Sequence, residues 1–282
     1  GATLVGDDES HFVRIHDDAH VAGAKRIYMT ATPKIYGEGA KSKAEETDVT
    51  LASMDDESIY GKVLFYRGFG WAVENNLLTD YKVLVFAVDE GLVSSRAQIS
   101  LGGDGDLKLD DATKMVGCYK ALGKIGFTDE QEQEAGEDLQ PMKRAIAFCQ
   151  NIALSKLFAQ EFGPVVVEYI ENELTDLHPD DTEEKRKKRL ALQLTDLSVE
   201  LEHIDGTFHA NDRNERLNWL KDDTDQNLCR ILTNVRCLSE GVDVPALDAV
   251  MFLHPRKSQI DVVQSVGRVM RKADDKDMGY VI

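Results

Sequence analysis

Short apolar runs, each followed by a polar or glycine-containing motif, recur along the second half of the chain. RAIAF starts at residue 144, CRILT covers 229–233, ALDAVMFL covers 246–253 and GYVI covers 279–282. Near-continuous apolar runs are typical of strands that a parallel sheet buries on both faces. Stretches with helical spacing lie between them, so the pattern predicts an α/β fold, a parallel sheet with flanking helices.

The helical stretch QSVGRVMR separates basic from apolar side chains. At about 100° per residue, Gln264, Arg268 and Arg271 fall on one face, whereas three valines and Met270 fall on the opposite face. We therefore expect the helix to dock by its apolar side and to present both guanidinium groups outward. A guanidinium fork matches phosphate oxygens, and Gly267 would let a phosphate or another backbone come close. An RxxR on a solvated helix face is the alternative interpretation.

Further polar residues follow the apolar runs. Thr233 ends one run, and Gly241 and Asp243 lie in the segment before the next. Open α/β sheets bind ligands outside the carboxyl ends of their strands. We therefore expect these three residues and the two arginines to lie along one edge of the sheet.

Two of these segments carry a resemblance to a known family. TNVRCLSEGVDVP at 233–245 resembles motif V of the superfamily two helicases and translocases, and QSVGRVMR at 264–271 resembles their motif VI. In that family the second RecA-like domain supplies arginine fingers to an ATP held mainly by the first domain. The resemblance implies catalytic roles for Arg268, Arg271 and Gln264, nucleotide contacts for Gly241, Asp243 and Gly267, and nucleic-acid contacts for Thr233, Arg236, Gln150 and Asn151.

TATP at 30–33 is similar to motif III of the same superfamily, and it follows a predicted strand at 26–29. In the family, the hydroxyls of this motif, here Thr30 and Thr32, couple the nucleotide side of the first domain to its nucleic-acid side. Two threonines before a proline also simply end a strand. The order of the three motifs along the chain favours the motif III interpretation.

Two other segments imitate nucleotide-binding motifs. HDDAH at 16–20 does not end a buried apolar strand, as a DExH box would, and GEGAKS at 37–42 lacks the glycine spacing of a phosphate loop. We therefore expect residue 1 to lie shortly after the true DExH box of a longer polypeptide. On this prediction ATP and Mg²⁺ are bound mainly by a first domain outside this sequence, and the fragment alone is inactive.

The motifs divide the chain into three parts. Residues 1–35 are predicted to complete the first RecA-like domain, 36–80 to form a connector, and 81–282 to form the second RecA-like domain, with an insertion near 91–141. FGWAVENNLLTDYKVLVFAVDE at 69–90 most closely resembles the type ISP restriction-modification enzymes and related restriction helicases. In those enzymes a nuclease precedes the motor and a methyltransferase follows it, so linked nuclease and methyltransferase domains are expected partners.

Local hydrophobic patterns predict further helices and strands. Helices are expected at 69–78, 112–122 and around the charged run 183–189, and a strand at 83–88. A strand ending at His203 should precede a helix capped by Asn211 or Asp212, with Glu215 as the partner of the cap.

Charge and composition narrow the functional class. The formal net charge of −18 argues against a general nucleic-acid binder. Residues 228–272, however, hold seven basic and four acidic side chains, so the motif edge is locally basic. No apolar run approaches the roughly 20 residues of a membrane span, and the four scattered cysteines suit buried, reduced thiols. These features favour a cytoplasmic protein without a membrane segment.

The sequence thus predicts part of an ATP-dependent DNA helicase or translocase, with backbone contacts to DNA. Two alternatives stay open at this point. The first is an RNA helicase, which keeps the motor and changes the nucleic acid. The second is a RecA-like module that binds a partner protein and no longer hydrolyses ATP.

Overall fold

The computed structural model describes eleven stretches of the chain: residues 14–46, 51–85, 109–125, 140–175, 182–194, 197–222, 227–235, 238, 247–256, 258–273 and 276–282. The chain divides into two compact units, Gly1–Gly68 and Phe69–Ile282. Each unit is described by itself.

The larger unit is built on a six-stranded sheet of order β1-β6-β5-β2-β4-β3. Every pairing between these strands is parallel. The predicted α/β fold with a parallel sheet is therefore confirmed. The strands are β1 (Asp80–Val83), β2 (Arg144–Phe148), β3 (Ser198–His203), β4 (Leu228–Asn234), β5 (Ala249–Phe252) and β6 (Met278–Val281).

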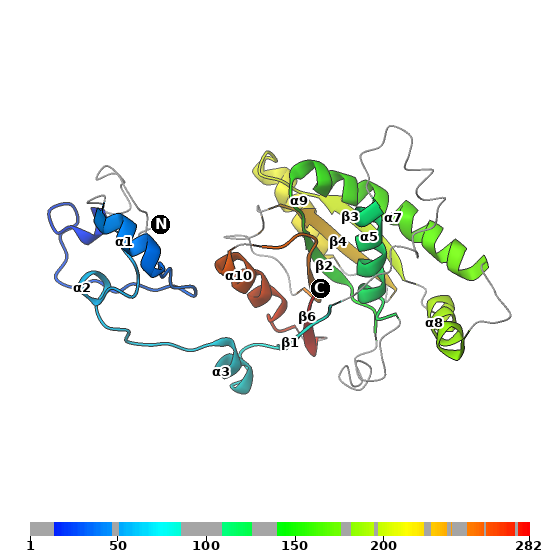
Figure 1. Ribbon diagram of the computed structural model, residues 1–282, viewed down its shortest axis with the longest axis horizontal. Helices are drawn as coiled ribbons and strands as arrows, with labels where there is room; N and C mark the ends of the chain where they lie inside the picture. Colours follow the sequence, from blue (N-terminus) through cyan, green and yellow to red (C-terminus); the bar gives the residue numbers. More distant parts are fainter. Residues whose placement is uncertain are drawn as a thin grey trace. The chain divides into compact units, whose positions relative to one another are not determined.

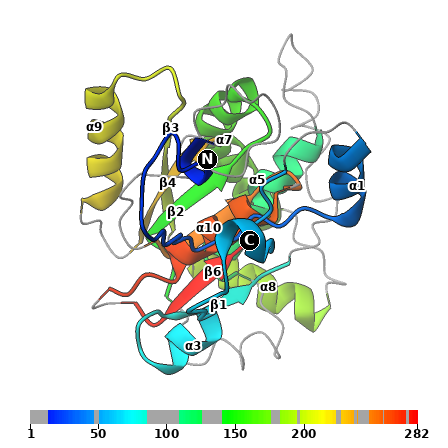
Figure 2. The same ribbon diagram turned by 90° about the vertical axis from the view of Figure 1, so that its left-hand side faces the viewer.

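Helices cover both faces of this sheet (Figures 1 and 2). Alternation along β2 shows the two layers, since Ala145 and Ala147 belong to one apolar cluster and Ile146 and Phe148 to the other. The first cluster takes in α5 (Leu109–Leu122) and α7 (Ile152–Thr175), and the second takes in α3 (Phe69–Glu74), α9 (Ala210–Lys221) and α10 (Gln259–Val269). The charged run folds as α8 (Glu183–Leu194).

The smaller unit contains η1 (Arg14–His16), α1 (Glu38–Glu46) and α2 (Glu57–Tyr60). Three aromatic rings hold its parts together. His16 Nδ1 lies 2.9 Å from the Tyr28 hydroxyl, and the ring of Tyr60 packs edge-on against both, with centroids 5.0 and 4.8 Å away. This cluster joins η1 and α2 to the stretch before TATP.

Several local predictions are confirmed. The strands at 144–148, 228–234, 249–252 and 278–281 and the helix at 112–122 occur where the apolar pattern placed them. The strand that ends at His203 and the helix after it also occur.

Other local predictions were wrong. Residues 26–29 form no strand in the described part of the chain, where no neighbouring strand pairs with them, and Ile27 and Met29 are exposed. Helix α3 ends at Glu74, before Asn76, whose φ of 57° is incompatible with a continued helix. The strand expected at 83–88 is β1 at Asp80–Val83 instead, and residues 86–88 lie outside the described residues. The N-cap of α9 is His209, without a side-chain hydrogen bond.

Candidate functional site at the carboxyl edge of the sheet

The carboxyl ends of the central strands bring polar residues from distant parts of the chain together. The register pairs His203 in β3 with Thr233 in β4, and Phe148 in β2 with Asn234 in β4. Helix α7 starts just beyond β2, so its first turn lies at the same edge. Parallel strands thereby place residues about 30 to 90 positions apart in sequence side by side.

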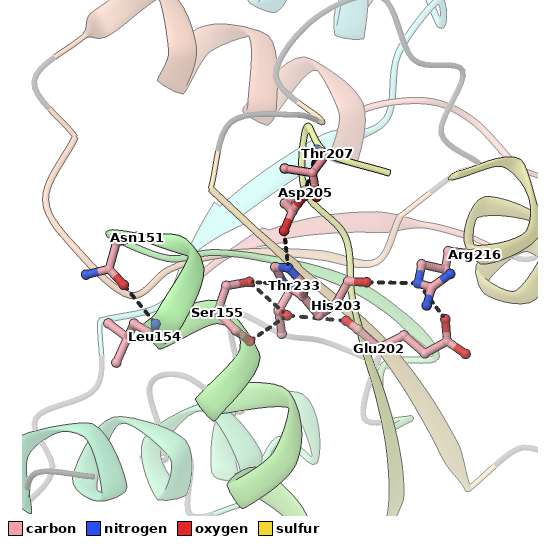
Figure 3. A network of polar contacts seen from close by, with 9 residues as sticks. All are labelled: Asn151, Leu154, Ser155, Glu202, His203, Asp205, Thr207, Arg216 and Thr233. Atoms are coloured by element: carbon pink, nitrogen blue, oxygen red, sulfur yellow. Dashed lines mark hydrogen bonds and ion pairs between the residues drawn. The ribbon is translucent and has the colours of Figure 1, made fainter. Parts of the chain in front are cut away.

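A polar network, which we call the Ser155 network, consists of Ser155, His203, Asp205, Thr207 and Thr233 (Figure 3). The hydroxyls of Ser155 and Thr233 lie 3.0 Å apart. The Thr233 hydroxyl also lies 2.9 Å from the Ser155 carbonyl oxygen, to which it can donate. Both side chains are 0% exposed, so these contacts satisfy polar groups that water does not reach.

The network continues through an imidazole to a carboxylate. His203 Nδ1 lies 2.7 Å from Ser155 Oγ, and His203 Nε2 lies 3.0 Å from Asp205 Oδ2. The other carboxylate oxygen of Asp205 accepts hydrogen bonds from the backbone N–H of Thr207 at 2.7 Å and from its hydroxyl at 2.6 Å. These bonds, led by the Thr207 hydroxyl, lower the pKa of Asp205 to about 2. Because an ionised carboxylate only accepts, Nε2 of His203 donates to it.

Serine, histidine and aspartate in a row suggest a hydrolase triad, but this arrangement cannot act as one. A nucleophile must meet its substrate, whereas Ser155 is completely buried. The contacts instead tie the first turn of α7 to the ends of β3 and β4 and to the loop after β3. We therefore interpret the Ser155 network as a brace that fixes the carboxyl edge.

The same burial applies to Thr233, whose predicted nucleic-acid contact stays a prediction. The sequence placed its hydroxyl on the nucleic-acid path, but in the structure that hydroxyl is fully buried and contacts Ser155 and the Glu202 carbonyl oxygen. Threonine is β-branched and sits on the α7 face of β4, where the helix covers it. In this conformation its side chain packs beneath the edge and links β4 to α7 and β3.

Arg216 of α9 extends the edge on the side of β3. Its Nε donates to the His203 carbonyl oxygen at 2.9 Å and lies 3.4 Å from a carboxylate oxygen of Glu202. Its guanidinium stacks over the ring of Phe208, 4.4 Å from the centroid. Arg216 was not among the site residues that the sequence predicted. The spacing of Leu217 and Leu220, both buried in the core, places Arg216 beside the packed face and could have indicated it.

The turn between β2 and α7 carries Gln150 and Asn151, both exposed. Asn151 caps α7, because its Oδ1 accepts from the backbone N–H of Leu154 at 2.8 Å. The amide nitrogen of Asn151 points away from that bond in Figure 3. It therefore keeps a donor at the edge while its oxygen serves the helix.

Helix α10, which carries the predicted arginines, docks as its pattern predicts. Ser258 caps its start by accepting from the Asp261 N–H, and Val266, Val269 and Met270 are buried. The opposite, polar face is less evenly exposed than expected. Gln264 is half-buried, and its Oε1 accepts no hydrogen bond within the described part of the chain.

The expected outward orientation of both arginines is correct for one of them only. Arg271 lies beyond the end of the helix and is exposed, whereas Arg268 is 7% exposed. The reason is the width of the packed stripe. Ser265, one turn before Arg268, is also buried. The contact face of α10 is therefore wider than the valine stripe and includes the position of Arg268.

Gly267 makes a close approach possible, but to a different neighbour from the one expected. A Cβ at this position would lie 3.5 Å from the ring of Phe69 in α3. The described neighbour of Gly267 is therefore an aromatic side chain, and α3 packs on α10 through it.

Not every predicted site residue can be placed. Arg236, Gly241 and Asp243 lie outside the described residues. Thr30 and Thr32 belong to the smaller unit, where Thr32 N–H donates to the Thr30 hydroxyl at 3.1 Å in an exposed turn.

Within the described stretches, no three His, Cys, Asp or Glu side chains gather in a way that could hold a metal ion. Cys118, Cys149 and Cys229 are buried free thiols, as predicted, and burial raises the pKa of Cys118 to about 12. Of the helices described, none has the length and apolar character needed to span a bilayer.

Comparison with known proteins identifies this arrangement. The family model for the helicase conserved C-terminal domain matches residues 133–273, half of the chain. Among solved structures, the ATP-dependent type ISP restriction-modification enzyme LlaBIII bound to DNA is 40% identical, with a TM-score of 0.71. The match covers 96% of this chain and 16% of that enzyme.

A viral protein also matches. The protein named "Putative helicase 22" of Sulfolobus islandicus filamentous virus is 30% identical over 95 residues, which cover 34% of this chain and 16% of the viral protein. The chain thus spans about one sixth of the length of either relative. The family match covers β2 to α10, and the predicted resemblance to the second RecA-like domain of a superfamily two helicase is confirmed. This chain belongs to the helicase conserved C-terminal domain family.

Proposed function

We propose that this chain is part of an ATP-dependent DNA translocase or helicase of a restriction-modification system. The observation that carries the proposal is the 40% identity to a type ISP restriction-modification enzyme across 96% of the chain. That enzyme is ATP-dependent and was solved bound to DNA, which favours DNA over RNA as the nucleic acid. Because the chain spans 16% of that enzyme, the complete protein would hold the remaining parts of the motor.

The domain arrangement belongs to the same proposal. Residues 1–35 would complete a first RecA-like domain, 36–80 would connect it to the second, and nuclease and methyltransferase domains would flank the motor. The first domain would hold most of the ATP and its Mg²⁺, an ion that neutralises charge on the β- and γ-phosphates when bound.

In this motor Arg271 is the best candidate for an arginine finger. Its side chain is exposed at the end of α10, and a guanidinium can offset the negative charge that develops on the γ-phosphoryl group. Arg268 is buried and would need to move, or would support the helix from within. Gln264, Gly267, Gly241 and Asp243 would complete the nucleotide side.

The nucleic acid would run along the carboxyl edge. The Asn151 amide nitrogen and Gln150 are exposed there, and we assign them, together with Arg236, to contacts with backbone phosphates. Contacts of this kind position the duplex and carry no sequence information. Thr233 and the Ser155 network would hold this edge in shape. Thr30 and Thr32 would couple the nucleotide side of the first domain to its nucleic-acid side.

The full-length protein allows a direct test. Arg271→Ala should lower the kcat of DNA-stimulated ATP hydrolysis by about 10³- to 10⁵-fold, the range known for arginine fingers. Lys272→Ala is the matched control, because Lys272 is the exposed cation next along the chain. Hydrolysis at the wild-type rate in Arg271→Ala would contradict the proposal and favour a RecA-like module that only binds a partner.

A second experiment concerns the fragment. The 282-residue chain by itself should show no DNA-stimulated ATP hydrolysis, because GEGAKS and HDDAH do not supply a phosphate loop and a DExH box. Asp17 of HDDAH already accepts hydrogen bonds from Ala19 N–H at 2.8 Å and contacts His20 at 2.7 Å. Turnover by the isolated chain would show that one of these segments binds nucleotide after all.

A further inference from the structure

The last carbonyl groups of α10 are held by residues from outside motif VI. The backbone N–H of Thr79, which lies just before β1, donates to the Met270 carbonyl oxygen at 2.9 Å. The Thr79 hydroxyl lies 3.0 Å from the same oxygen and 3.2 Å from the Arg271 carbonyl oxygen. A helix end leaves such carbonyl groups without partners within the helix, so Thr79 caps α10 from a position 192 residues away in sequence.

A buried lysine completes this cap. The Lys276 side chain donates to the Val269 carbonyl oxygen and, at 3.2 Å, to the Arg271 carbonyl oxygen. Lys276 is only 9% exposed, and burial of an ammonium group is costly unless acceptors surround it. The negative end of the helix dipole and its free carbonyl oxygens supply those acceptors.

The sheet topology explains why the two groups meet. β1 and β6 are neighbours, with Asp80 opposite Met278. Thr79, directly before β1, is therefore level with the residue that follows Lys276. Both strands begin beside the end of α10, and the Arg271 carbonyl oxygen receives a contact from each of them.

We propose that Thr79 and Lys276 are positioning residues for Arg271. They hold its carbonyl oxygen from two sides, and so fix the point on the backbone from which the exposed guanidinium extends. The inference rests on the proposed role of Arg271 as an arginine finger. It adds that the connector, through Thr79, takes part in aiming that finger at the phosphate.

Catalytic rates depend strongly on the position of the reacting groups, since a displacement of a catalytic group by about 1 Å can lower the rate about 10²-fold. Thr79→Val removes the hydroxyl and keeps the shape and the backbone N–H bond. We expect it to lower kcat for DNA-stimulated ATP hydrolysis about 10-fold or more in the full-length protein. Thr79→Ser, which restores the hydroxyl, should recover most of the rate. Lys276→Met should lower kcat in the same way.

A double-mutant cycle separates positioning from mere stability. If Thr79 acts through Arg271, Thr79→Val should cause little further loss in the Arg271→Ala background. Thr113→Val is the matched control: its hydroxyl bonds to the Leu109 carbonyl oxygen inside α5 at 2.9 Å, away from this site, and kcat should stay at the wild-type value. Urea denaturation of each variant shows whether it is folded under the assay conditions.

The possible failures are distinct. Wild-type turnover in Thr79→Val and Lys276→Met, combined with a collapse in Arg271→Ala, would overturn the positioning role alone. The same would follow if Thr79→Val lowered the rate of Arg271→Ala by the full factor that it causes in the wild type. Wild-type turnover in Arg271→Ala would overturn the proposed function together with this inference.

Discussion

Gly279 in β6 offers a test of how tightly the end of α10 is packed against the sheet. A Cβ at this position would lie 2.3 Å from the Val269 carbonyl oxygen and 2.9 Å from the Val269 carbonyl carbon. Ordinary close carbon–oxygen contacts are about 3.3 Å or longer. Gly279→Ala would therefore force the two backbones apart by about 1 Å.

Neither backbone can move without loss. The Val269 carbonyl oxygen also accepts from Lys276, and β6 is paired on both sides, with β1 and β5. Overpacking of a filled interior costs about 1–3 kcal/mol, and the disturbed hydrogen bonds place this substitution at the upper end. We expect the free energy of unfolding to fall by about 3 kcal/mol.

The assay is urea denaturation of the 282-residue chain, with tryptophan fluorescence as the signal of unfolding. Both tryptophans, Trp71 and Trp219, belong to the larger unit, so the signal reports the unit that contains the substitution. With a slope of about 3 kcal/mol per molar urea, the midpoint should fall by about 1 M.

The control is the same substitution where space is available. Gly163 lies inside α7 with no atom within 4 Å of an added Cβ. Gly163→Ala should raise the free energy of unfolding by about 0.5–1 kcal/mol, because glycine is a poor residue inside a helix. Equal midpoints for Gly279→Ala and the wild type would refute the close approach and the capped helix end with it.

Three further substitutions test the contacts at the edge and at the helix end. Burial lowers the pKa of Lys276 from 10.5 to about 8. Between these two pH values the unfolded chain binds more protons at Lys276 than the folded chain does. The contribution of Lys276 to the free energy of unfolding should therefore rise by about 3 kcal/mol as the pH rises through this range. The difference in unfolding free energy between the wild type and Lys276→Met, followed from about pH 7 to about pH 10, measures this rise, and a flat difference would contradict it. Asp205→Asn should cost about 1.5–3 kcal/mol at neutral pH through weakened bonds from His203 and Thr207. Because the pKa of Asp205 is lowered to about 2, this deficit should shrink as the pH falls from about 4 toward 2; a deficit independent of pH would show that the charge is not involved. Asn151→Ala should cost about 1 kcal/mol by removing the cap of α7, whereas Asn151→Asp should retain it; equal stability of the two variants would argue against the cap.

The sequence predicted β2, β4, β5 and β6 well because each contains an apolar run that the fold largely buries, whereas β1 and β3 carry polar and partly exposed residues. It predicted the docked face of α10 for the same reason. Burial of Arg268 escaped prediction, since the width of a contact face depends on the neighbouring elements and not on the helix alone. Residues 26–29 have strand-like composition but no pairing strand in the described chain, and composition does not supply a partner.

The brace at the carboxyl edge could be predicted only in part. His203 and Asp205 lie two residues apart at the end of a strand, a spacing that suggests a shared surface. Their link to Ser155 and Thr233 depends on tertiary contacts between residues 48 and 78 positions apart, which local patterns do not encode. The cap of α10 by Thr79 joins residues that are 192 positions apart in sequence. Its prediction would have required the order of the strands in the sheet.

That strand order has a mechanical consequence. β1 lies at the margin of the sheet, and among the described strands it is paired with β6 alone. A pull on the chain before Thr79 would load this strand before the interior strands. Separation of its first residues from β6 would break the Thr79 contacts at the end of α10 and leave those of Lys276 in place. Tension on the chain before Thr79 would in this way loosen the backbone at Met270 and Arg271 without unfolding the central strands.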